Sequence, residues 1–354
     1  MKGKMDWSGY KTLTVWTLLC GGCMAAMMWW AAGKSIVIAD TAPGDREGYV
    51  AQEDEGVERY RLTLAEEEGK PGHFTIPVAP AVHAEQISIE NRYTERQLWV
   101  YIQGAQAADY RDYVITGDVS PVVGGWAQQQ EDMTILKLQM NAIQEYSSVM
   151  EENRLYVEYM SPEECFERIV VIDPRCGGED AGVKASGLQE KEITLQIARA
   201  VRQRLDGSDI KVYLTRQEDV DVASEDRTLL AREVGADLYV AVSLNGDAQD
   251  REQFGTEVWY NGDYFLPGFG NLQLADLLER QVTVAVSGRA NGLMLSDDAV
   301  LQRLTIPGAL VKVGYLTHER EGKMLGQQGY VDNVAAGITE ALRQAFAELE
   351  SEES

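Results

Sequence analysis

The segment VVIDPRCGGEDAG, residues 170–182, has the composition of a loop that presents a reactive side chain. Its apolar run ends in an Asp-Pro pair and is followed by Gly177 and Gly178, a pattern that predicts a buried strand leading into a tight loop. Ligand sites of α/β folds lie at such loops. The loop presents Cys176, with Arg175 beside it. A cysteine here can be a metal ligand, a thiol nucleophile, or what is left of another site.

Further polar residues stand at the ends of predicted elements or inside apolar ones. Glu190 begins a predicted helix whose apolar residues recur every four positions. Ser243 and Asn245 end the apolar segment ADLYVAVSLN, and Lys312 lies inside the apolar segment PGALVKVGYL. A fold must bring these segments together before their side chains can act as one site.

From residue 167 onward, predicted strands and helices alternate. This alternation predicts a three-layer α/β domain, residues 163–350, with a central and mostly parallel sheet. The predicted strands are 167–173, 210–215, 237–245, 256–260 and 309–316, and the predicted helices are 190–205, 224–234, about 272–282 and 330–349.

Residues 60–162 show a different pattern of short apolar runs separated by turn residues. Six or seven such runs predict a small all-β, sandwich-like domain. The runs are RYRLTL, HFTIPV, EQISIENRY, QLWVYIQG, YVITGDV, MTILKLQMN and NRLYVEYM.

The N-terminal segment, residues 1–39, predicts a membrane anchor. Residues 13–32 carry no charge and are long enough to cross a bilayer as one transmembrane helix. Three lysines precede the run, which predicts a cytoplasmic N-terminus and places the bulk of the chain outside the cell membrane. The alternative is a signal peptide that is cleaved to release a secreted protein. Residues 40–59 are acidic and aperiodic, and predict a linker.

The composition narrows the possible partners. The formal net charge is −25 over 354 residues, a sign that repels phosphate backbones, so we expect no nucleic-acid ligand. The four cysteines do not form a disulfide framework, because two lie in the predicted anchor and a predicted strand separates Cys165 from Cys176.

These motifs, taken in order, resemble the zinc-dependent N-acetylmuramoyl-L-alanine amidases of the Amidase_3 type over residues 168–348. The resemblance rests on the segments IDPRCGG, LTRQEDVD, ADLYVAVSLN and PGALVKVGYL, together with Glu190 and Arg227 at two helix starts. The preceding β domain resembles the AMIN module, which stands before such catalytic domains and can bind cell wall.

The resemblance implies a zinc site and a catalytic glutamate. The family's first histidine ligand corresponds to Cys176, its glutamate ligand to Glu190, and its second histidine ligand to Ser243, while Asn245 keeps the family's asparagine. The family's catalytic glutamate corresponds to Lys312. The same comparison indicates that Asp173, Gly177, Gly178, Arg227 and Gly314 are scaffold residues of the site.

Three of the four functional positions have therefore changed. A thiolate at Cys176 is compatible with zinc, but a Ser243 hydroxyl is a weak ligand and a Lys312 ammonium cannot act as a base. We predict that zinc is lost and that Lys312 occupies the vacated position, paired with Glu190. Three alternatives remain: Glu190 only favours the start of a helix, Cys176 is inert, or His318 supplies a replacement ligand.

Three functions follow from these expectations. The first is a membrane-anchored pseudo-amidase of peptidoglycan metabolism that binds cell wall or a partner hydrolase. The second is an active amidase that cleaves the bond between the muramoyl group and L-alanine. The third is a structural adaptor in a division or spore-envelope assembly, with the β domain as the recognition element.

Overall fold

The computed structural model describes residues 35–37, 58–67, 71–264 and 268–353. The chain divides into two compact units. The first contains the residues up to Asn141 together with Tyr146–Tyr159, and the second contains Ala142–Glu145 together with Met160–Ser354. The predicted anchor helix, 13–32, and most of the predicted linker lie outside the described residues.

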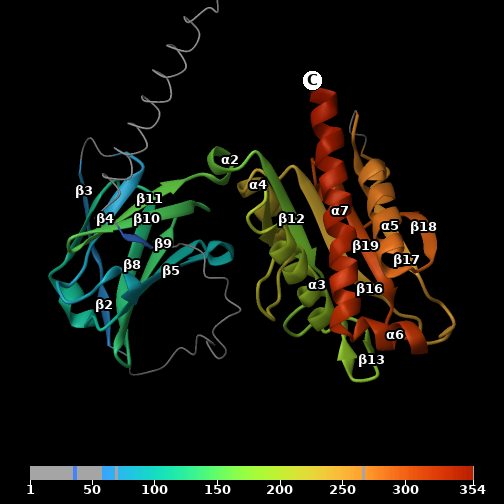
Figure 1. The fold of residues 1–354 in the computed structure, drawn as a ribbon, viewed down its shortest axis with the longest axis horizontal. Helices are drawn as coiled ribbons and strands as arrows, with labels where there is room; N and C mark the ends of the chain where they lie inside the picture. The colour runs from blue at the N-terminus through green and yellow to red at the C-terminus, as the bar shows by residue number, and fades with distance from the viewer. Residues whose placement is uncertain (1–34, 38–57, 68–70, 265–267, 354) are drawn as a thin grey trace, which may run out of the picture. The chain divides into compact units, whose positions relative to one another are not determined.

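The first unit is all-β, as predicted (Figure 1). Two mostly antiparallel sheets enclose one apolar core, with β3 and β7 as a parallel pair. One sheet has the order β1 (Ser35–Val37), β10 (Glu145–Glu151), β11 (Arg154–Met160), β4 (His73–Pro77), β7 (Val114–Gly117) and β3 (Thr63–Glu66). The other has the order β2 (Arg59–Arg61), β8 (Val122–Gln130), β9 (Met133–Met140), β6 (Gln97–Gln103) and β5 (Ile87–Arg92).

Strand β6 shows why the residues of this unit form a sandwich. Its alternate residues Leu98, Val100 and Ile102 are fully buried in the core between the sheets. Trp99 and Tyr101 point to the opposite face, where they join a smaller apolar cluster.

The second unit is an α/β domain with a mostly parallel sheet, as predicted, but the sheet has six strands rather than the five predicted, because Ala290–Leu295 adds a strand at one edge. Strands β15, β12, β16 and β19 run parallel, and β17 is antiparallel to β19. The strand order is β15 (Ile210–Leu214), β12 (Arg168–Pro174), β16 (Leu238–Asn245), β19 (Gly308–Tyr315), β17 (Thr256–Tyr260) and β18 (Ala290–Leu295).

Three helices cover one face of this sheet, and α7 lies between the other two (Figure 1). These are α3 (Glu190–Leu205), α5 (Asn271–Val286) and α7 (Gln328–Glu353), and their apolar residues share one core with those of the sheet. Helix α4 (Ser224–Glu233) packs against the other face. The smaller elements of this unit are α2 (Pro162–Cys165), the β13–β14 hairpin (Lys184–Ala185 and Leu188–Gln189), η4 (Leu301–Arg303) and α6 (Glu319–Leu325).

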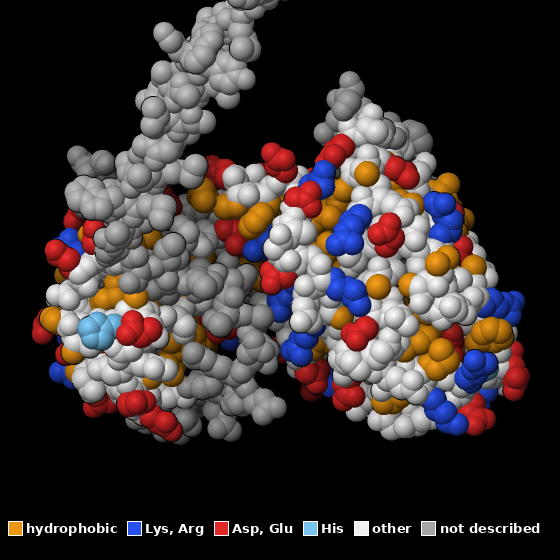
Figure 2. All heavy atoms as spheres, in the orientation of Figure 1, with side chains coloured by type: hydrophobic (Ala, Val, Ile, Leu, Met, Phe, Trp, Pro, Cys, Tyr) orange, Lys and Arg blue, Asp and Glu red, His pale blue; other side chains and the backbone are white. Residues whose placement is uncertain are grey.

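Within the described residues, no helix is both long and apolar enough to cross a membrane. On the visible face of the second unit, acidic and basic side chains are interspersed (Figure 2).

Candidate functional site

The loop after β12 places Cys176 at the carboxyl edge of the sheet. Its backbone is left-handed over three consecutive residues, with φ of 64° at Cys176, 141° at Gly177 and 56° at Gly178. A Cβ on Gly177 would lie 2.2 Å from the carbonyl oxygen of Val220, so this position requires glycine. A left-handed cysteine persists only where its surroundings impose the conformation.

Arg216 holds the backbone that precedes Cys176. Its buried guanidinium donates hydrogen bonds to the carbonyl oxygens of Pro174 at 3.0 Å and Lys191 at 2.7 Å, and also to those of Arg175 and Glu218. One side chain thereby joins the loop after β12 to the first turn of α3. The LTR segment was evident in the sequence, but the contacts of its arginine with this loop were not.

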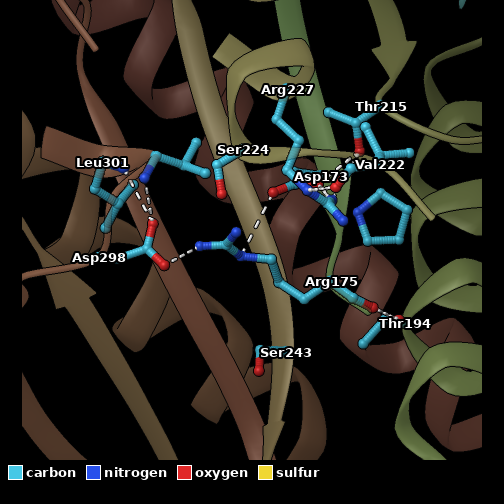
Figure 3. A network of polar contacts seen from close by, with 12 residues as sticks. Asp173, Arg175, Thr194, Thr215, Val222, Ser224, Arg227, Ser243, Asp298 and Leu301 are labelled. Carbon is cyan, nitrogen blue, oxygen red and sulfur yellow. Dashed lines mark hydrogen bonds and ion pairs between the residues drawn. The ribbon is translucent and has the colours of Figure 1, made fainter. Parts of the chain in front are cut away.

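Asp173 anchors the other side of the loop in a buried polar network (Figure 3). Its carboxylate accepts a hydrogen bond of 2.6 Å from the Thr215 hydroxyl and forms an ion pair with Arg227 from α4. Arg175 lies 3.5 Å from the second carboxylate oxygen. The two predicted scaffold residues, Asp173 and Arg227, thus tie β12 to α4.

Arg175 also forms an ion pair with Asp298 in the segment before η4. In Figure 3 its side chain crosses β16 between Asp173 and Asp298, with Ser243 farther along the same strand. Burial alone would raise the pKa of Asp298, but the charge and hydrogen bond of Arg175 lower the pKa below its usual value.

Glu190 lies beneath this loop as the first residue of α3 and is 4% exposed. One carboxylate oxygen accepts hydrogen bonds from the Ser243 hydroxyl at 2.6 Å and from the backbone N–H of Leu244 at 2.8 Å. The other oxygen accepts the backbone N–H of Val183 at 2.9 Å. Neutral donors therefore occupy both oxygens and hold α3 to the end of β16.

The Cys176 thiol is a neighbour of this carboxylate. A Cβ built on Gly182 would lie 2.6 Å from the Cys176 sulfur and 2.4 Å from the Glu190 carboxylate, so both groups border the same glycine. Burial, followed by the charges of Glu190 and Asp180, raises the pKa of Cys176 to about 12. Cys176 is consequently a thiol at neutral pH.

Lys312 shares this edge of the sheet but does not pair with Glu190, so the predicted ion pair is wrong. In the register of the sheet, Lys312 lies beside Ser243 of β16 and Glu257 of β17. Its ammonium nitrogen lies 4.5 Å from the centroid of the Trp259 ring. Trp259 is on the side of β19 away from β16, and its ring face attracts the cation.

The remaining predicted residues support these positions. A Cβ on Gly178 would lie 2.4 Å from Asp221, and one on Gly314 would lie 2.7 Å from the buried Glu321 side chain. Asn245, at the end of β16, is buried.

The family profile described as N-acetylmuramoyl-L-alanine amidase matches residues 170–344. The germination-specific N-acetylmuramoyl-L-alanine amidase of Bacillus subtilis is 30% identical over 197 residues, which cover 51% of this chain and 81% of that protein. This chain belongs to the N-acetylmuramoyl-L-alanine amidase family. It is therefore a protein of peptidoglycan metabolism.

Other members of the amidase family show similar matches over about half of the chain. The amidase CwlM of Bacillus licheniformis is 30% identical over 181 residues, which cover 50% of this chain and 68% of that protein. The crystal structure of an amidase from Clostridium difficile 630 is 30% identical, with a TM-score of 0.49, and covers 51% of this chain and 97% of that chain.

The donor set at this amidase site does not fit the zinc ion of the family. Ser243 donates its proton to Glu190, and Glu190 uses both oxygens for internal hydrogen bonds. Burial and the charges of Glu190 and Asp180 raise the pKa of Cys176, which disfavours the thiolate form that binds a metal ion. In the described ranges, no group of three histidine, cysteine, aspartate or glutamate side chains is arranged to hold a metal ion.

His318 does not supply the missing ligand. Its Nδ1 accepts a hydrogen bond of 3.1 Å from the backbone N–H of Glu321 and so caps α6. Its ring lies against Phe254, with the centroids 5.4 Å apart.

Proposed function

We propose that this protein is a non-hydrolytic member of the amidase family that acts by binding peptidoglycan or a partner hydrolase. The supporting observation is the hydrogen bond from Ser243 to Glu190. The hydroxyl that replaces one metal ligand donates to the carboxylate that corresponds to another. The site is thus satisfied internally, without a metal ion.

Lys312 supports the same proposal. An ammonium at the position of the family's catalytic glutamate cannot accept a proton from water, and it repels a metal ion. Two unit charges 4 Å apart interact by about 4 kcal/mol at an effective dielectric constant near 20, and a divalent ion would feel about twice that.

The deciding experiment measures the zinc content of the full-length protein after exposure to excess zinc and desalting, together with hydrolysis of purified peptidoglycan. We expect no stoichiometric zinc and no release of peptides. Stoichiometric zinc that is lost in Glu190→Ala, accompanied by peptide release, would refute the proposal.

An active amidase is the second candidate. The names of the relatives favour it, because the 30% identical proteins from two Bacillus species are called amidases. In that case the muramoyl–L-alanine bond would be cleaved with an unusual donor set. The hydrolysis assay above separates the two candidates directly.

Two further features belong to this proposal. We place the chain at the cell membrane through residues 13–32, with the bulk outside the cytoplasm, and assign recognition of cell wall to the AMIN-like first unit. The adaptor alternative for a division or spore-envelope complex would be supported if the protein retained an envelope protein but not purified peptidoglycan.

A further inference from the structure

We infer that Lys312 recognises a carboxylate of the cell-wall polymer. This inference rests on the proposed function, because it names the chemical group that the non-hydrolytic site binds. It also gives the glutamate-to-lysine change a role beyond the loss of activity.

Lys312 is a half-buried cation without an acidic partner. It lies in the central strand β19, and its neighbours Val311 and Val313 point into the helix-covered core. Its side chain therefore points to the opposite face, the face of Ser243. Within the described part of the chain, no carboxylate lies within ion-pair distance of its nitrogen, and the ring of Trp259 is its neighbour.

Two carboxylates flank Lys312, and neutral donors hold both of them. On one side, Glu190 accepts hydrogen bonds from the Ser243 hydroxyl and from two backbone N–H groups. On the other side, Glu257 is the register partner of Lys312, yet it accepts hydrogen bonds from the Tyr315 hydroxyl at 2.5 Å and the Trp259 indole at 3.2 Å. Neither carboxylate forms an ion pair with the Lys312 ammonium, which lies over the Trp259 ring.

Charges of both signs surround Lys312: Glu257 is its register partner, and the carboxylates of Asp247 and Glu321 act on Tyr315, three residues along the same strand. The buried guanidinium of Arg216 is bonded to carbonyl and hydroxyl oxygens and not to a carboxylate, and its charge acts on neighbouring Cys176. Lys312 and Glu257 are both partly exposed, and each carboxylate oxygen of Glu257 accepts one hydrogen bond.

The reaction of the family indicates which carboxylates are available. Hydrolysis of the muramoyl–L-alanine amide breaks the C–N bond and adds water, leaving a carboxylate on the muramoyl group and an amine on the peptide. A cation at the position of the catalytic glutamate is complementary to this carboxylate product rather than to the neutral amide substrate. Carboxylates of the stem peptides in uncleaved polymer are the other source of the same chemistry.

The test is co-sedimentation of the full-length protein with three insoluble polymers. These are intact peptidoglycan, peptidoglycan stripped of its peptides by an active amidase, and the stripped polymer with its carboxylates converted to neutral amides. Lys312→Met removes the charge and keeps an apolar stem, Lys312→Arg keeps the charge, and Lys323→Ala removes an exposed lysine of α6 as a matched control.

We expect the native protein, Lys312→Arg and Lys323→Ala to bind at least one unmodified polymer about tenfold or more tightly than the neutralised polymer. Lys312→Met should lose that preference while keeping the native thermal transition. Preference for the stripped polymer identifies the muramoyl carboxylate as the ligand, and preference for the intact polymer identifies a stem-peptide carboxylate.

Equal binding by Lys312→Met and native protein would overturn the inference and leave the proposed function standing. Equal binding of the native protein to neutralised and unmodified polymers would do the same. Release of peptides from intact polymer with bound zinc would instead overturn the proposed function.

Discussion

The hydroxyl of Ser243 donates a 2.6 Å hydrogen bond to the carboxylate of Glu190, 53 residues away in the sequence. This contact joins the carboxyl end of β16 to the first residue of α3. In a zinc amidase a metal ion would connect these two positions. Here a single hydroxyl and two backbone N–H groups hold the carboxylate instead.

Ser243→Ala should destabilise the second unit. The substitution removes one of three donors from a buried carboxylate, and a hydrogen bond to a charged group contributes about 1.5–3 kcal/mol. Urea unfolding should show this loss in the free energy of unfolding. Ser351→Ala, which removes an exposed hydroxyl at the end of α7, should change that free energy by less than about 0.5 kcal/mol. Equal effects of the two substitutions would contradict the assigned role of Ser243.

Asp173→Asn should lower the free energy of unfolding more than Ser243→Ala does. Asp173 is fully buried and pairs with Arg227, so the neutral amide leaves a buried guanidinium uncompensated, at a cost of about 3–5 kcal/mol. The measurement is again the free energy of unfolding. Arg280→Ala breaks the exposed pair with Asp276 and should cost less than about 1 kcal/mol.

The Cys176 thiol should react slowly in the folded protein. Its pKa is raised to about 12 by burial and by the charges of Glu190 and Asp180, so little thiolate exists at pH 8. Iodoacetamide labelling, read by peptide mass spectrometry, should be at least about tenfold slower at Cys176 in buffer than in urea. Rapid labelling of the folded protein at pH 7 would show that the thiolate is present.

The raised pKa of Cys176 also determines how the stability of the protein depends on pH. An unfolded thiol loses its proton near pH 8.5, whereas folded Cys176 keeps it up to about pH 12. The unfolded state binds fewer protons in this window, so stability should fall as the pH rises from about 8.5 to about 12. Cys176→Ser should show a smaller decrease than the native protein in unfolding curves recorded across this window.

The proposed loss of zinc predicts that the family's residues, placed back at these positions, create a zinc site. A variant with Cys176→His, Ser243→His and Lys312→Glu presents two histidines beside Glu190 and removes the repelling ammonium. At zinc concentrations 100-fold above its dissociation constant, the ion should stabilise this variant by about 2.7 kcal/mol. Zinc should not raise the thermal transition of the native protein, and Glu190→Ala in the variant background should abolish the gain.

Local patterns in the sequence identify the elements that frame the site. Helix α3 and strands β12, β16 and β19 carry strong apolar periodicity or continuous apolar runs, so they are visible without a fold. Strand β18 of the second unit escaped prediction, and so did strands β8 and β10 of the first. Strand β8 contains two glycines and ends in three glutamines, and neither strand shows a clean alternation; both are strands because of the partners they pair with.

Sequence reasoning missed the contacts that Trp259, Arg175 and Arg216 make in the site. Trp259 lies in a strand that was predicted, TEVWY, but its proximity to Lys312 depends on β17 pairing antiparallel with β19. Arg175 was noticed beside Cys176, but its partner Asp298 lies 123 residues away. No local sequence pattern predicts contacts between residues so far apart in the chain.

The sequence by itself determined the order of the amidase motifs and the four positions at which ligands and base are expected, because residue types and strand runs are local properties. Only the tertiary structure decided which groups the charged side chains of those residues contact. Lys312 turns toward Trp259 because the sheet order places an aromatic face on that side. Glu190 accepts hydrogen bonds from Ser243, Leu244 and Val183, which only folding brings together around its oxygens.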